Sequence, residues 1–228
     1  MSSRADILAR VRANLGIRDG DAARDEARRA KASRFLAARS EGPRPDIGGD
    51  LAARFSAKSV AMSSTVETLA SADAIPAAVR RYLDGLGLPL RAVCWPQFAD
   101  LGWKAAGLDV AMRGACGEDA VGITGCFCAI AETGTLMLAS GPETAATTSL
   151  LPETHIAVVP VSRIVPAMEE AFALLRAECR QSGDDLPRAV NLVSGPSRTG
   201  DIEQTIVLGA HGPYRVHLIL VEGRPAPD

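Results

Sequence analysis

The stretch that most constrains the fold is Ala129–Ser140, in which one polar tetrapeptide separates two apolar runs. Residues 129–131 and 136–139 carry no charge, and short uncharged runs of this kind are typical of strands that are buried on both faces. The tetrapeptide between them begins with Glu132. A carboxylate next to two buried strands loses hydration, so it needs hydrogen-bond partners or an altered pKa. We therefore expect a sheet to be built around this turn.

Two interpretations of the turn remain open at this point. It can be a hairpin turn in which Glu132 caps backbone amides, because turns favour such residues. It can also be a site loop at the edge of a sheet, in which Gly134 lets a ligand approach the backbone. Other segments of the chain are needed to decide between the two.

The composition is that of a globular protein without an obvious polyanionic partner. The 228 residues are 47% hydrophobic and 23% charged, which suits one domain with an appendage. Aromatic residues make up 4%, too few to build stacking platforms for bases. The net charge of −2 gives no overall attraction to nucleic acid or to an anionic membrane. We expect no nucleic-acid partner.

The cellular compartment is inferred from what the sequence lacks. Charged residues are spaced through Met1–Leu15, so no signal peptide is expected there. No uninterrupted apolar segment reaches the roughly 18 residues that a membrane span requires, so we expect none. Five cysteines is an odd number in a chain without an export signal, which favours reduced thiols. We expect a cytoplasmic protein.

The first 49 residues are predicted to be a helical arm and linker. Ser3 and Asp6 form a capping box at the start of a helix over residues 3–15. A second helix, rich in Ala and Arg, is expected over residues 21–39, followed by a Gly- and Pro-rich linker. Residues 1–58 carry a net charge of +5 and the remainder −7, and the basic part is typical of a solvated helical face. The domain proper is predicted to span residues 50–228.

From Leu51 onward, helices and strands are expected to alternate. This alternation favours the α/β class, with a largely parallel sheet flanked by helices. The predicted helices cover residues 51–58, 74–86 and 166–179, and the predicted strands cover residues 59–62, 90–95, 108–112, 156–161, 189–193 and 214–221.

A second polar segment, Ser194–Glu203, follows a predicted strand and is a candidate anion site. Gly195 and Gly200 free the backbone, while the hydroxyls and the guanidinium of Arg198 are donors that hold carboxylate or phosphate. Asp201 can begin a short helix whose amides add to the site. Ligands favour the carboxyl ends of α/β strands, so we expect this segment to lie beside the 132–135 turn. Alternatively, Arg198 only pairs with the neighbouring carboxylates at the surface.

The histidines and cysteines predict no metal site. His211 stands in a turn before Gly-Pro, where it can exchange a proton or simply bond a backbone carbonyl. His155 has the same two interpretations, and His217 lies within a strand, where packing is expected. Cys126 and Cys128 share one face of a strand, but their spacing matches no zinc or iron–sulfur pattern.

Four segments together resemble the motif series of the LUD-domain family, that of lactate utilization protein C. They occur in the family's order and are Ala129–Leu138 (AIAETGTLML), Leu151–His155 (LPETH), Ser194–Glu203 (SGPSRTGDIE) and Leu208–Pro213 (LGAHGP). The resemblance implies an α/β fold of the NagB/RpiA/CoA transferase-like class for residues 50–228. It also implies a part in oxidising L-lactate to pyruvate beside iron–sulfur partner subunits, as the subunit without the cluster. No cofactor carries over from the resemblance.

Two hypotheses of function follow. In the first, the chain is a subunit of a lactate-oxidising complex whose pocket holds a small anionic ligand, and it can also form a homo-oligomer. In the second, it is an independent acyl- or phosphoryl-transfer enzyme that uses Glu132, by analogy with the nucleophile of CoA transferases. The predicted catalytic residues are Glu132 and His211, and the predicted ligand-binding residues are Thr133, Gly134, Thr135, Ser194, Gly195, Ser197, Arg198, Thr199 and Asp201.

Overall fold

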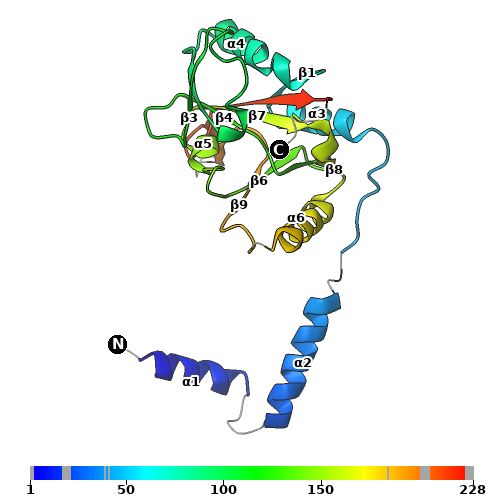
Figure 1. Cartoon of the computed structure of the whole chain (residues 1–228). Helices are drawn as coiled ribbons and strands as arrows, with labels where there is room; N and C mark the ends of the chain where they lie inside the picture. Colours follow the sequence, from blue (N-terminus) through cyan, green and yellow to red (C-terminus); the bar gives the residue numbers. More distant parts are fainter. Residues whose placement is uncertain are drawn as a thin grey trace. The chain divides into compact units, whose positions relative to one another are not determined.

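The computed structural model describes residues 3–16, 22–38, 40, 42–183, 185–200 and 206–223. The chain divides into two compact units, residues 1–45 and residues 46–228 (Figure 1). The first unit holds two helices, α1 (Arg4–Asn14) and α2 (Ala22–Ala38). The predicted capping box is confirmed, because Asp6 N donates to Ser3 Oγ at 3.2 Å and Ser3 N donates to Asp6 Oδ2 at 2.9 Å. Neither helix has a buried residue, and Phe35 of α2 is 73% exposed.

The second unit is built on a six-stranded parallel sheet, called here the large sheet. All of its neighbouring strands run parallel. In sheet order the strands are β1 (Thr65–Leu69), β12 (Arg215–Val221), β7 (Thr154–Pro160), β4 (Val121–Thr124), β2 (Arg91–Cys94) and β3 (Asp109–Met112).

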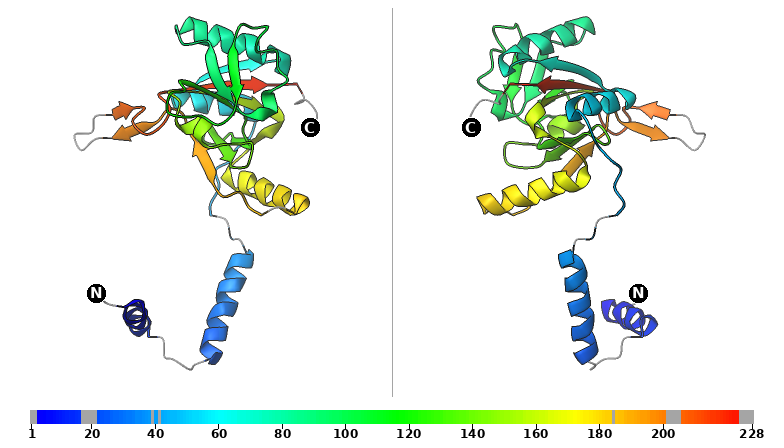
Figure 2. Two further views of the ribbon diagram at one scale, coloured as in Figure 1. Left: turned by 60° about the vertical axis from the view of Figure 1, so that its left-hand side comes forward. Right: turned by 90° about the vertical axis from the view of Figure 1, so that its right-hand side faces the viewer.

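A four-stranded mixed sheet, called here the small sheet, packs against the large one. Its β5–β8 pair is parallel, whereas β6 is antiparallel to both of its neighbours. In sheet order its strands are β8 (Ile164–Val165), β5 (Cys128–Ile130), β6 (Thr135–Ala139) and β9 (Val190–Val193). A separate hairpin of β10 (Arg198–Gly200) and β11 (Ile206–Leu208) extends away from the two sheets (Figure 2).

Helices flank this pair of sheets. The α-helices are α3 (Leu51–Ala61), α4 (Ile75–Gly85), α5 (Thr147–Leu150) and α6 (Met168–Ser182), and the short 3-10 helices are η1 (Ala72–Ala74), η2 (Pro96–Phe98) and η3 (Val161–Arg163). Helix α4 covers the outer face of the large sheet and α6 covers the outer face of the small sheet, whereas α3 packs on the same side of the large sheet as the small sheet. Figure 1 shows α4 and α6 on opposite sides of the unit. The described helices include none that combines the length and the apolar character needed to cross a membrane.

The side chains that pack together in each hydrophobic core show the order of the layers. Ile219 of β12 packs in one core with Leu83 of α4. Its neighbour Leu218 faces the opposite way and packs with Leu136 of β6 and Phe55 of α3. The large sheet is therefore buried on both faces, by α4 on one side and by the small sheet and α3 on the other.

The small sheet is also buried on both faces. Ala129 of β5 faces the large sheet, while Ile130 packs with Ala171 of α6. This double burial explains why residues 129–131 and 136–139 carry no charge.

The predicted α/β class is confirmed: a mostly parallel sheet flanked by helices. Three local predictions are wrong. Cys126 and Cys128 were expected on one face of a strand, but Cys126 precedes β5 and the two residues pack in different cores. Residues 59–61, expected in a strand, continue α3, because the buried Phe55 and Ser59 lie four residues apart on one helix face. Residues 198–200, expected in a loop, form β10, since they pair with residues 206–208 of β11.

Candidate functional site

The Glu132–Thr135 segment forms the hairpin turn between β5 and β6. Gly134 N donates to Ile130 O at 3.0 Å, and Gly134 has a positive φ of 67°. The Glu132 backbone N–H is bonded to Pro166 O at 2.9 Å. The Glu132 carboxylate is half-buried and makes no hydrogen bond or ion pair with any residue that the structure describes. The turn is thus a hairpin, but its carboxylate does not cap it.

A chain of three hydroxyls links this turn to the segment that follows β9. Thr133 Oγ1 lies 2.7 Å from Thr135 Oγ1, which lies 2.7 Å from Ser194 Oγ. Thr135 is 3% exposed, so the centre of this hydroxyl chain is shielded from water. The two segments meet because β6 and β9 are antiparallel neighbours, with Leu136 opposite Val193. The sequence predicted that the two segments meet at the carboxyl ends of one parallel sheet. They do meet, but as the ends of two antiparallel strands of the small sheet.

Two glycines let the end of α3 pack against both segments. A Cβ on Gly134 would lie 2.6 Å from the backbone nitrogen of Ser59. A Cβ on Gly195, whose φ is 85°, would lie 2.3 Å from Met62 O. The space beside Gly134, interpreted from the sequence as an approach for a ligand, is therefore occupied by α3. Ser59 Oγ also donates to Gly134 O at 3.4 Å.

Arg198 is held by a residue that sequence reasoning missed. One terminal nitrogen of its guanidinium donates to the hydroxyl of Ser63, just beyond the end of α3. Ser63 has a φ of 69°, a left-handed conformation that is uncommon outside glycine and often marks a functional position. Arg198 is exposed, and it makes no ion pair with a described carboxylate. Asp201, a predicted ligand-binding residue and candidate helix start, lies outside the described residues.

The 209–213 segment is tied to the same region through Ser197. Ser197 N donates to Pro213 O at 2.9 Å, and Gly209 N donates to Ser197 O at 2.9 Å. His211 lies in this segment, is exposed, and makes no side-chain hydrogen bond within the described part of the chain. Thr199 lies opposite Val207 in the β10–β11 hairpin.

The Leu151–His155 segment adjoins the first residue of β12. Arg215 N donates to Glu153 O at 2.9 Å, and the Arg215 guanidinium lies 3.9 Å from the Glu153 carboxylate. His155 is fully buried, and its Nε2 lies 2.8 Å from Thr124 Oγ1. Burial lowers the pKa of His155 to about 4, so its imidazole is neutral at pH 7.

His217 packs, as its strand position predicted. Its ring stacks on Tyr82 with 3.9 Å between ring centroids, and its Nδ1 lies 2.8 Å from Thr65 Oγ1. Burial lowers its pKa to about 4, against the opposing effect of the nearby Glu67. His217 is neutral at pH 7 and belongs to the core.

All four motif segments thus reach the amino edge of the large sheet. Ser63, which holds Arg198, comes two residues before β1. Pro213, which holds Ser197, comes two residues before β12, and Glu153 directly precedes β7. Sequence reasoning placed the site at the carboxyl ends of the strands, whereas the predicted ligand-binding residues that the structure describes lie near the amino ends.

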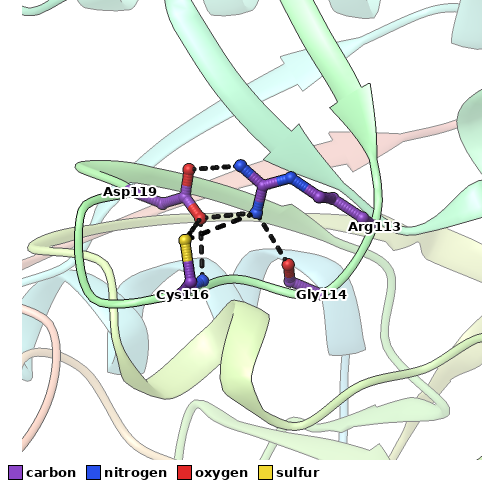
Figure 3. Close-up of polar contacts among 4 residues, drawn as sticks. All are labelled: Arg113, Gly114, Cys116 and Asp119. Carbon is purple, nitrogen blue, oxygen red and sulfur yellow. Dashed lines mark hydrogen bonds and ion pairs between the residues drawn. The ribbon is translucent and has the colours of Figure 1, made fainter.

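A separate polar cluster closes the loop between β3 and β4 (Figure 3). The Arg113 guanidinium binds both carboxylate oxygens of Asp119, at 2.7 and 2.9 Å. Cys116 N also donates to Asp119 at 2.8 Å, and its thiol lies 3.2 Å from the same oxygen. The Arg113 guanidinium holds the pKa of Asp119 well below its usual value. Among the described residues, no three His, Cys, Asp or Glu side chains are grouped as metal ligands.

Comparisons with known proteins agree with this fold and these segments. Residues 53–221 match the family model of the LUD domain. The chain is 42% identical over 123 residues to lactate utilization protein C of Bacillus licheniformis, an alignment that covers 54% of this chain and 50% of that protein. It is 42% identical over 104 residues to lactate utilization protein C of Bacillus subtilis, covering 46% of this chain and 43% of that protein. The chain spans about half the length of the curated relatives it matches.

A solved structure has the same fold. It is the crystal structure of a DUF162 family protein from Deinococcus radiodurans, which matches with a TM-score of 0.55 and 26% sequence identity over 75% of this chain and 96% of that chain. Fold and motifs together define an α/β domain in which a mixed sheet packs on a parallel one. The chain belongs to the LUD domain family.

Proposed function

We propose that this chain takes part in the oxidation of L-lactate to pyruvate, as a subunit that works with iron–sulfur partner proteins. The names of its relatives, lactate utilization protein C, support the metabolic role. The observation that carries the proposal is the hydrogen bond between Thr135 and Ser194, which joins two motif segments 59 residues apart into one surface.

The proposed ligand at this surface is a small carboxylate such as lactate or pyruvate. The end of α3 carries the negative pole of the helix dipole, which by itself repels an anion. Lys58 in the last turn of α3 and Arg198 beside Ser63 offset that pole with two positive charges. The planar guanidinium of Arg198 can grip both carboxylate oxygens, and the hydroxyl of Ser194 adds a further donor.

Glu132 and His211 are the titratable side chains that we assign to proton transfer. Oxidation of lactate to pyruvate releases two protons and two electrons. One of these two groups, a carboxylate or a neutral imidazole, can accept the proton of the lactate hydroxyl and the other the hydrogen that leaves Cα as a proton, while the two electrons pass to the partner proteins. The names of the relatives do not favour the acyl- or phosphoryl-transfer alternative.

Calorimetric titration of lactate, pyruvate and a phosphorylated sugar tests the proposed anion site. Arg198→Ala is expected to weaken binding of the preferred anion about ten- to a hundredfold, because a charge-assisted contact contributes roughly 1.5–3 kcal/mol. Arg198→Lys should restore affinity in part, since a point charge cannot form the bidentate fork. Arg180→Ala, which removes another exposed arginine from α6, is the matched control and should bind like the wild type. Wild-type affinity in Arg198→Ala would remove Arg198 from the site.

A further inference from the structure

A cavity of about 210 Å³ lies at the carboxyl edge of the large sheet, the edge opposite the motif segments. Five of the six parallel strands contribute to its lining from their carboxyl ends or from the residues that follow them. These contributions are Ala72 after β1, Gln97 after β2, Cys126 after β4, Val158 and Pro160 of β7, and Val221 and Gly223 at the end of β12.

The cavity lies beside a reversal in the topology of the large sheet. The chain that follows β2 packs on the face covered by α4, where Trp103 and Leu108 join the same core as Leu83. The chain that follows the neighbouring β4 crosses to the other face and enters the small sheet. In open parallel sheets, ligands bind in the crevice between neighbouring strands whose connections leave on opposite faces. Gln97 and Cys126 stand on the two sides of this crevice.

The walls of the cavity are apolar and uncharged. The described residues that line it include no Asp, Glu, Lys, Arg or His, and the apolar ones include Ile75, Phe98, Leu101, Val158 and Val221. An ion placed between such walls loses hydration without gaining a partner charge. Lactate and pyruvate, which are carboxylates at pH 7, therefore do not fit this cavity.

Two polar side chains supply the directional contacts that such a cavity needs. Gln97 lies over the backbone after β4, where a Cβ on Gly125 would come within 2.4 Å of its Nε2. Gln97 is exposed and its amide makes no hydrogen bond within the described part of the chain, so its two donors and its acceptor can exchange water for a ligand. Burial raises the pKa of the Cys126 thiol to about 12, and the thiol therefore stays protonated and neutral.

We propose that this cavity binds a small uncharged organic molecule with an apolar body and one carbonyl or carboxamide group, which pairs with the amide of Gln97. The volume sets the size, because pockets for drug-sized ligands measure about 300–1,000 Å³. The site is separate from the proposed anion site and does not depend on the role in lactate oxidation.

Titration of benzamide, followed by the NMR shifts of methyl groups in the cavity wall, tests the proposal. Benzamide has an apolar ring and a carboxamide, and benzoate has the same shape with a negative charge. Benzamide is expected to shift the methyl signals of Leu101, Val158 and Val221 saturably, and benzoate is expected to leave them unshifted. Gln97→Leu keeps the size of the side chain but removes the amide, and should weaken benzamide binding about tenfold. Gln181→Leu, at an exposed position of α6, is the matched control and should bind like the wild type.

A second variant acts on the same amide from Gly125, in the backbone directly after β4. Gly125→Ala places a methyl group where Gln97 lies, so it should displace the amide and weaken benzamide binding as Gln97→Leu does. The proposal is overturned if benzamide gives no saturable shift, if benzoate binds as well as benzamide, or if Gln97→Leu binds benzamide like the wild type. Arg198 lies at the other edge of the large sheet. The titration of lactate into Arg198→Ala therefore tests the proposed anion site independently of the benzamide results.

Discussion

The two edges of the large sheet differ in chemistry. The amino edge carries the motif segments, with an exposed arginine, a chain of hydroxyls and two left-handed glycines packed against α3. The carboxyl edge carries an apolar cavity with one amide and one neutral thiol. The general rule for α/β sheets assigns ligands to the carboxyl edge. Here the polar chemistry is at the other edge, because the antiparallel β6–β9 pair brings the Glu132–Thr135 turn and Ser194 there.

The largest effect is expected at the contact between the β5–β6 turn and α3. Gly134→Ala should destabilise the protein by about 2–5 kcal/mol, from the cost of a left-handed alanine and the clash of its Cβ with the backbone of α3. Gly87→Ala is the matched control, because Gly87 also has a positive φ of 62° but open space around it. That variant should lose about 1–2 kcal/mol.

Denaturant unfolding of the two glycine variants measures the difference. Equal losses of unfolding free energy would mean that α3 moves easily away from the added methyl group, and that the amino edge is not a rigid surface.

The next effect is a dependence of stability on pH that arises from two buried histidines at the amino ends of their strands. His155 and His217 have pKa values of about 4 in the folded protein, below the ordinary 6.5. The unfolded chain therefore binds more protons between pH 6.5 and 4, and stability falls as the pH is lowered through this range. Each histidine should contribute a loss of about 2 kcal/mol between pH 7 and 5.

Unfolding free energies measured from pH 7 to 5 check this prediction. His155→Gln and His217→Gln should each flatten the pH dependence, whatever their effect on stability at pH 7. Asp119, whose pKa is depressed, loses its contribution only below its ordinary value of 3.8 and so does not interfere. A slope unchanged in both variants would show that neither histidine takes up a proton on unfolding.

The smallest effect is expected within the hydroxyl chain. Thr135→Val keeps the shape of the buried side chain but removes its hydroxyl, at a cost of about 1 kcal/mol, because Ser194 is exposed and can bond to water instead. Thr133→Val, at the exposed end of the same chain, should cost less. Thermal unfolding of both variants gives the loss of stability of each. A larger loss of stability for Thr133→Val than for Thr135→Val would contradict the shielded position of Thr135.

Part of the fold and of the candidate site can be predicted from local sequence. The rest depends on contacts between residues that are far apart in the sequence. The uncharged runs around Glu132 predicted buried strands joined by a turn, and the strand over residues 214–221 followed from its apolar pattern. The segments containing Thr135 and Ser194 were expected to meet, and their side chains do. The role of Ser63 could not be predicted, because it depends on where the end of α3 packs after folding.

The carboxyl-edge cavity could not be predicted for a similar reason. Gln97 and Cys126 are ordinary residues in their own segments, and only the order of strands in the large sheet brings them to one crevice. The three residues of β10 gave no strand signal because pairing with β11 is what makes them a strand.

The most direct test of the central claim is a reconstitution of lactate oxidation. The purified chain, the iron–sulfur partner proteins, and the two together are each supplied with L-lactate, and reduction of an electron-accepting dye is followed alongside pyruvate formation. Full activity is expected only in the mixture, and a mixture that contains Arg198→Ala in place of the wild type is expected to need at least tenfold more lactate. Equal activity of the partner proteins without this chain, or lactate oxidation by this chain alone, would contradict the proposed role of the chain.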